Sequence, residues 1–162
     1  MNNIGDIEKI TTFKSPEDSP GFLLWHISSA WRSALEDVLK PLDLTHPQFV
    51  VLATKAWLTR KGNIINQIDI SKAAGLDPNT TSQILRGLEI KKFIKRTQSL
   101  NERSKNPMPT SLGSKILQNA LPAVENADAQ FFKSLSIKNL NDLIKLFQKI
   151  IAKNDLGKII KR

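Results

Sequence analysis

The chain contains no cysteine and no tyrosine among its 162 residues. Without thiols it can form no disulfide, no thiolate metal site and no cysteine-based redox sensor. Its two histidines, His26 and His46, show no metal-ligand spacing to each other or to acidic residues. The sequence therefore predicts a protein that binds no metal and no other cofactor.

Signals for membranes and for enzymes are also absent. No apolar run approaches the roughly 18 residues that span a bilayer, and the N-terminus lacks the basic-then-apolar order of a signal peptide. The chain has no Gly-rich phosphate loop, no Gly-x-Ser-x-Gly elbow and no His-Glu-x-x-His pair. We therefore expect a cytoplasmic protein that is not an enzyme and has no membrane partner.

Acidic residues are few compared with basic ones. The chain has 15 Asp plus Glu against 24 Lys plus Arg, which gives a formal net charge of +9. Such a balance favours polyanionic partners, among which nucleic acids are the first to consider.

Two short helices that meet at a glycine turn are predicted within residues 67–90. Gly75 can adopt the left-handed backbone conformation that ends a helix. Asp77 is a suitable N-cap for the next helix, and Pro78 suits its first position because the missing N–H costs nothing there. A basic strand-turn-strand pattern follows, and this order is typical of a winged helix-turn-helix.

The second of these helices has two distinct faces. Its apolar and small residues recur at three- and four-residue spacing and should pack inward; they are Thr81, Ile84, Leu85 and Leu88. The opposite face carries amide and guanidinium groups, which can pair bidentately with purine edges in a major groove, and hydroxyls near the helix start could reach phosphates or bases. The predicted DNA-contacting residues of the helix are Asn79, Thr80, Ser82, Gln83 and Arg86. The competing interpretation is an ordinary solvent-facing side.

A basic stretch directly follows this helix and contains Lys91, Lys92, Lys95, Arg96, Arg103 and Lys105. Phe93 and Ile94 indicate a first strand, residues 99–106 a polar turn, and residues 107–110 a return strand. Such a hairpin is a wing that can lie along a DNA backbone or place an arginine in a minor groove. Arg96, Arg103 and Lys105 are its predicted DNA contacts.

The segments before this motif are predicted as an arm and two helices. Residues 1–21 are poor in apolar side chains, so we expect a mobile or loosely docked arm. An apolar stripe beginning at Phe22 predicts a helix that ends before Pro41. Thr45 is a suitable N-cap for the next helix, and residues 64–65 could add a short strand to the wing.

Two helices are predicted after the wing. Ser111 should cap one that runs to about residue 135, and Ser136 should cap another over residues 137–151. Pro122 should kink or break the first of them. These helices and the N-terminal one carry more apolar surface than a small DNA-binding unit can cover, which predicts a partner subunit.

Three segments of the chain carry a family resemblance. They are residues 44–52 (LTHPQFVVL), residues 76–85 (LDPNTTSQIL), and residues 101–104 (NERS) with Thr110 and Gly113. They resemble, in this order, the Leu-Thr-x-x-Gln-Phe segment, the recognition helix and the wing of the MarR family (multiple antibiotic resistance regulators). The likeness extends over nearly all of the predicted folded chain.

The resemblance implies a mainly α fold with a small β-wing. A winged helix-turn-helix DNA-binding domain at residues 46–110 would be flanked by dimerisation helices at residues 22–45 and 111–162. Two subunits would interlock through these helices and place their recognition helices in successive major grooves of a pseudo-palindromic operator. The implied function is that of a homodimeric transcriptional regulator of double-stranded DNA, expected to be a repressor. The alternative is a winged-helix module that binds nucleic acid or protein without operator specificity or effector response.

The resemblance also implies a small aromatic or anionic effector bound between the dimerisation helices and the DNA-binding unit. Trp25, His26 and Trp31 on the first helix could line such a cleft. The competing interpretation places the two tryptophans in the core or the dimer interface and His26 on the surface.

Several positions depart from the family pattern. Gly87 stands where an arginine is common, and Asn101 stands where the wing commonly has Asp. Asp43 and Lys92 replace usual glycines, and Pro109 should break up the strand before the next helix. We expect these changes to reduce affinity or alter local geometry without contradicting the fold.

Overall fold

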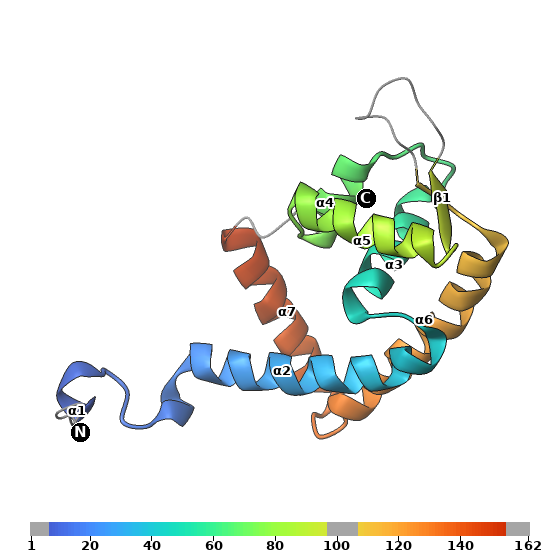
Figure 1. Cartoon of the computed structure of the whole chain (residues 1–162). Helices are drawn as coiled ribbons and strands as arrows, with labels where there is room; N and C mark the ends of the chain where they lie inside the picture. The colour runs from blue at the N-terminus through green and yellow to red at the C-terminus, as the bar shows by residue number, and fades with distance from the viewer. Residues whose placement is uncertain (1–6, 97–106, 155–162) are drawn as a thin grey trace, which may run out of the picture.

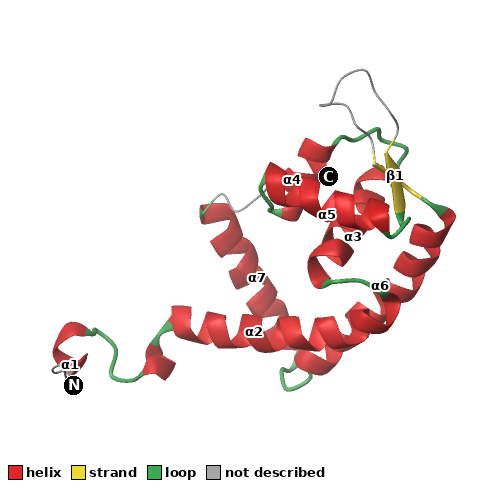
Figure 2. Cartoon of the chain, in the orientation of Figure 1, coloured by secondary structure: helices red, strands yellow, loops and turns green. Residues whose placement is uncertain are grey.

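A computed structural model describes residues 7–96 and 107–154 of the chain (Figure 1). Helices dominate, and the two short strands lie at one edge of the molecule (Figure 2). No helix in the described ranges combines the length and apolar character needed to cross a bilayer. In chain order the elements are α1 (Ile7–Ile10), η1 (Pro16–Asp18), α2 (Pro20–Leu39), η2 (Lys40–Leu42), α3 (His46–Thr59), α4 (Gln67–Ala74), α5 (Pro78–Ile90), β1 (Ile94–Arg96), β2 (Pro107–Pro109), α6 (Ser111–Phe131) and α7 (Ile137–Lys153).

The first long helix, α2, begins two residues earlier than the predicted Phe22. Ser19 caps it by accepting a hydrogen bond from the backbone N–H of Phe22 at 3.4 Å, and Pro20 occupies the first helical position. These two residues supply a complete helix start, which the apolar stripe alone could not indicate. The helix ends at Leu39, before Pro41 as predicted.

The start of α3 confirms the predicted cap and adds a second bond to it. The Thr45 hydroxyl accepts from the backbone N–H of Gln48 at 3.4 Å, and the Gln48 side chain accepts from the backbone N–H of Thr45 at 3.2 Å. This reciprocal pair is a capping box, which fixes the direction in which the chain enters α3.

The α4–α5 turn is the predicted one. Gly75 ends α4 with φ of 67°, in the left-handed region. The Asp77 carboxylate then accepts from the backbone N–H groups of Asn79 and Thr80, both at 2.9 Å, and Pro78 begins α5. The helix-turn-helix is therefore confirmed down to its capping residues.

The strands form a two-stranded antiparallel sheet in which Ile94 lies opposite Pro109. Pro109 is thus part of the return strand, and the expectation that it would break the strand was wrong. The predicted strand at residues 64–65 does not form either. Ile65 is buried in the core, and Asn66 immediately caps α4 by accepting from Asp69, so no residues remain there for pairing with the wing.

Helix α6 differs from the prediction at both ends, and Pro122 does not break it. Its cap is Thr110, whose hydroxyl accepts from the backbone N–H of Gly113 at 3.0 Å, rather than Ser111, and it ends at Phe131 rather than near residue 135. The helix continues through Pro122. Both Pro122 and Gln118, whose carbonyl loses its helical donor, are exposed, so water can bond that carbonyl.

The hydrophobic core contains residues from the C-terminal end of α2, from α6 and from the elements between them in the chain. We call α3, α4, α5, β1 and β2 the winged-helix lobe. Helices α2 and α6 pack against each other, and Figure 1 shows α2 extending beyond the lobe, with α1 at its far end. The buried apolar residues are Leu35, Leu39, Leu44, Phe49, Val51, Leu52, Ile65, Ile70, Leu85, Leu88, Phe93, Ile94, Leu117, Ala120 and Val124.

Candidate nucleic-acid interface

Helix α5 is anchored to the lobe by one face. Leu85 and Leu88 are buried on that face, and Thr81 is fully buried, with its hydroxyl donating to the Asp77 carbonyl at 2.9 Å. Because these side chains lie inside the lobe, the opposite face of α5 must point outward. The inward set predicted from spacing is confirmed, with Ile84 half-buried at its edge.

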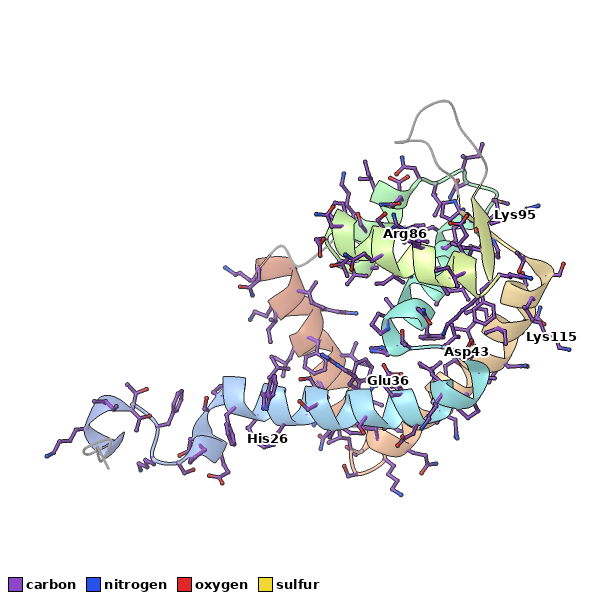
Figure 3. All side chains as sticks on the ribbon, viewed as in Figure 1. His26, Glu36, Asp43, Arg86, Lys95 and Lys115 are labelled. Atoms are coloured by element: carbon purple, nitrogen blue, oxygen red, sulfur yellow. The ribbon has the colours of Figure 1, made fainter. Side chains whose placement is uncertain are left out.

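The outward face of α5 carries three of the predicted contact residues. Asn79, Gln83 and Arg86 are all exposed, and Figure 3 labels Arg86 on this helix. They recur at four- and three-residue spacing and so extend over roughly 10 Å of helix axis, about the height of three base pairs. The structure thus brings these three polar side chains together on one exposed face.

The two hydroxyl residues near the helix start are placed differently. Thr80 is exposed, but its hydroxyl donates to the Asp77 carboxylate and so belongs to the cap. That bond, together with the backbone N–H of Thr80, lowers the pKa of Asp77 below its usual value. Ser82 is half-buried. Contacts of Thr80 and Ser82 with DNA remain predictions.

The described lysines after α5 do not all face solvent. Lys95 on β1 is exposed, and Lys92 is exposed in the turn before it. Lys91 instead donates its ammonium hydrogen bonds to the α2–α3 turn. Of Arg96 only the backbone in β1 is described, and Arg103 and Lys105 lie outside the described residues. The charge pattern gave no signal that Lys91 faces the protein rather than solvent.

Two further surfaces are apolar and uncovered within one chain. The N-terminal half of α2 exposes a cluster in which Trp25 is 68% exposed. No residue of α7 is buried, although its apolar residues share one face. The exposed large apolar residues of these two helices are Phe22, Leu23, Leu24, Trp25, Ile27, Ile137, Ile144, Leu146, Phe147 and Ile150.

The predicted effector residues fall into two places. The Trp31 indole N–H donates to the Asp128 carboxylate at 2.7 Å, and its ring meets the edge of His46 at 5.1 Å between centroids. Trp31 therefore connects α2 to α6 and α3. Trp25 and His26 lie on the exposed part of α2, where His26 stacks edge-on against Phe22. The structure does not bring the three residues together, and the cleft remains a prediction.

His46 occupies the junction between the lobe and α2. Its backbone N–H donates to the Glu36 carboxylate at 2.9 Å. Burial lowers the pKa of His46 below its usual value and outweighs the opposing effect of Glu36 and Asp128, while Arg32 adds to the lowering. No cluster of three or more His, Cys, Asp or Glu residues suited to a metal occurs in residues 7–96 and 107–154.

Sequence comparison gives two agreeing results. The profile of the MarR family matches residues 44–105. The chain is 33% identical over 146 residues to the uncharacterized HTH-type transcriptional regulator YdcH of Bacillus subtilis, and the match covers 82% of this chain and 95% of that protein.

Solved structures share the fold over most of the chain. CouR from Rhodococcus jostii bound to p-coumaroyl-CoA superposes with a TM-score of 0.73 at 23% identity, covering 85% of this chain and 95% of that one. The S. aureus MepR–DNA complex gives 0.73 at 24% identity, covering 86% and 99%. The mainly α fold with a small wing is thus confirmed, and the chain belongs to the MarR family of winged helix-turn-helix transcriptional regulators.

Proposed function

We propose that the protein is a homodimeric repressor that binds a pseudo-palindromic operator. The observation that carries this proposal is the outward face of α5, where Asn79, Gln83 and Arg86 are exposed on one side of the helix. Amide side chains pair with adenine and guanidinium groups with guanine in the major groove. Two recognition helices related by a two-fold axis would read half-sites about one helical turn apart.

Several properties of the chain support DNA as the partner. The net charge of +9 attracts a polyanion, and Lys95 lies exposed on β1, the strand that precedes the predicted wing turn in the sequence. The S. aureus MepR structure, which has a similar fold, was solved with DNA. We assign residues 46–110 to DNA binding, as the sequence indicated. A dimer bound across a promoter would exclude polymerase, so we propose that the protein represses transcription. We also propose that it acts in the cytoplasm.

The uncovered faces of α2 and α7 support the dimer. Trp25 and Phe147 are exposed in the single chain. Covering such apolar side chains with a second copy removes them from water and so stabilises the dimer. We therefore assign residues 22–45 and 111–162 to dimerisation. A charge placed on the apolar face of α7 should dissociate the dimer without disturbing the core, because no residue of α7 is buried in the monomer.

Sedimentation of two full-length variants tests this assignment. Phe147→Glu should shift the protein toward monomer, whereas Asn141→Glu, which adds the same charge to the exposed polar side of α7, should remain dimeric. A dimer that survives Phe147→Glu unchanged would show that α7 is not the interface.

Selection of duplexes from a random-sequence library tests the operator. We expect the selected duplex to be a pseudo-palindrome bound about a thousandfold more tightly than random DNA. Binding without such preference would instead support the winged-helix module that lacks operator specificity.

A matched pair of glutamine variants then tests the recognition face. Gln83→Ala should relax preference at one base position per half-site, at a cost of about 1–3 kcal/mol there. Gln130→Ala removes an exposed amide from α6 and should leave base preference unchanged. Equal behaviour of the two variants would remove Gln83 from the operator contacts.

We also propose that a small aromatic or anionic effector releases the DNA. CouR, which has a similar fold, was solved with p-coumaroyl-CoA bound, and Trp25 and His26 are exposed where a partner or ligand could cover them. The test is release of the selected operator by p-coumaroyl-CoA and by its free acid. Trp25→Ala should weaken any such response more than it weakens operator binding.

A further inference from the structure

Lys91 at the C-terminal end of α5 binds the turn between α2 and α3. Its ammonium donates to the Asp43 carbonyl at 2.7 Å, to the Asp43 carboxylate at 2.9 Å and to the Gln48 side chain at 3.2 Å. An ammonium group has three protons, so these acceptors use its full donor capacity. The Lys91 side chain is only 25% exposed. It is therefore occupied by the protein and is not available to a phosphate.

A second contact lies one turn earlier on the same helix. A Cβ added at Gly87 would lie 3.0 Å from the Gln48 amide nitrogen, so the backbone of α5 approaches this side chain closely. Gln48 is itself held by the capping box with Thr45. The last turn of the recognition helix thus packs on a side chain whose own position is fixed.

The other side of this turn is bonded to α2, which lies outside the lobe. The Leu44 N–H donates to the Leu39 carbonyl at 3.3 Å, and the His46 N–H donates to Glu36 on α2. The α2–α3 turn therefore contacts α2 on one side and the end of the recognition helix on the other. Figure 3 labels Asp43 in this turn and Glu36 on α2.

We propose that Lys91, Asp43 and Gln48, the Lys91 clamp, set the orientation of the recognition helix relative to α2. This inference rests on the proposed operator function. In a dimer held together through α2, that orientation fixes the distance and the rotation between the two recognition helices. One extra base pair between half-sites moves them apart by about 3.4 Å and rotates them by roughly 34°. If the Lys91 clamp holds the recognition helix in one orientation, the dimer cannot adjust to the inserted base pair. Lys91 is therefore a positioning residue.

The experiment compares affinities for the duplex that the wild type selects and for the same duplex with one base pair inserted between half-sites. The wild type should prefer the selected spacing by about tenfold or more, the penalty expected when one half-site is misaligned. Lys91→Met should reduce this preference to about threefold or less, since a loosened helix can adjust. Lys14→Met removes the same charge from an exposed position before α2, outside the assigned DNA-binding and dimerisation ranges, and should keep the wild-type preference.

A milder variant and a second readout keep the inference testable if Lys91→Met folds poorly. Asp43→Asn removes one acceptor charge and keeps a residue that tolerates the left-handed backbone found there, with φ of 52°. This variant should also reduce the preference for the selected spacing. The salt dependence of operator binding should keep its slope in Lys91→Met, because no phosphate contact is lost.

The outcomes separate the clamp from the proposed function. Failure of the wild type to select any duplex would reject the operator function. A wild type that selects its operator, together with Lys91 and Asp43 variants that keep its spacing preference, would reject the clamp alone. A salt slope lowered by about 1 in Lys91→Met would show that Lys91 contacts a phosphate instead.

Discussion

The winged-helix lobe and helix α7 show opposite uses of apolar residues. In the lobe, side chains such as Leu85 and Leu88 are almost completely buried within one chain. In α7, apolar residues recur with equal regularity, yet none is buried. Periodicity alone therefore shows that a face must be covered, but it does not show whether the same chain or a second copy covers it.

The difference has a thermodynamic consequence. Contacts inside the lobe stabilise each subunit at any concentration, whereas contacts made between copies stabilise the folded state by mass action. Substitutions in the two regions should therefore be distinguishable by how unfolding depends on protein concentration.

The largest expected change in unfolding free energy comes from shortening one apolar side chain in the lobe. The comparison is with one shortened side chain in α7. Leu88→Ala should cost about 3–5 kcal/mol of unfolding free energy, because it opens a cavity at a side chain with no exposed surface. The loss should be the same at every protein concentration.

Phe147→Ala, at a residue 40% exposed in the single chain, should act only through the dimer. It should therefore change how the unfolding free energy depends on protein concentration. Chemical denaturation over a range of concentrations measures both, and a concentration-independent loss in Phe147→Ala would place α7 inside the subunit's own core.

A smaller but still large effect is expected where α6 packs on the lobe. A Cβ added at Gly113 would lie 1.9 Å from the Phe93 carbonyl oxygen, and backbone there is held by Thr110, whose N–H donates to the same carbonyl at 3.0 Å. Gly113→Ala should therefore destabilise the protein by about 2–3 kcal/mol, since backbone must shift. Ser114→Ala, at the exposed neighbouring position, should change thermal stability little. Equal stability of both variants would contradict the close packing.

The helix ends show which features the sequence could predict. Caps at Thr45, Asp77 and Ser136 were predicted correctly because the bonding atoms lie within three residues of the cap. Gly75 was predicted for the same reason, since its backbone conformation is a local requirement.

Two of the failures arise where distant segments determine the structure. The strand expected at residues 64–65 does not form, because Ile65 is buried in the core formed by other elements. The interaction of Lys91 with Asp43 joins residues 48 positions apart, and a run of basic residues contains no trace of it. The exposed face of α5 could be predicted, but the bonds that orient this helix could not.

A gain of stability is expected at Lys92, where the lobe holds a lysine in a conformation suited to glycine. Lys92 has φ of 59°. The N–H of Lys92 donates to the Glu89 carbonyl and that of Phe93 to the Leu88 carbonyl, both at 2.9 Å, which is the Schellman pattern that ends many helices at a glycine. Lys92→Gly should raise the unfolding free energy by about 1 kcal/mol by removing the strain.

Asp43 provides the matched control for this prediction. Its φ of 52° is also left-handed, but its carboxylate accepts from Lys91. Asp43→Gly relieves less strain, because Asp tolerates the left-handed region better than Lys does, and it loses that bond. It should therefore gain less stability than Lys92→Gly when thermal unfolding is measured. A larger gain at Asp43 would show that its ion pair contributes nothing to the folded state.

The smallest expected effect lies at His46, the residue that joins the lobe to α2. Because burial lowers its pKa in the folded protein, the unfolded chain binds more protons there as pH falls below the usual value of about 6.5. The stability associated with neutral His46 is therefore present above that pH and is lost as pH falls toward the folded-state pKa. The loss should be small, because the side chain is only partly buried and solvent screens it. His46→Gln keeps the backbone N–H that donates to Glu36 and removes the titration, so its unfolding free energy should fall less than that of the wild type between about pH 7 and pH 5. If the two proteins lose the same stability over this interval, burial of His46 does not control its protonation, and the junction between the lobe and α2 is insensitive to pH.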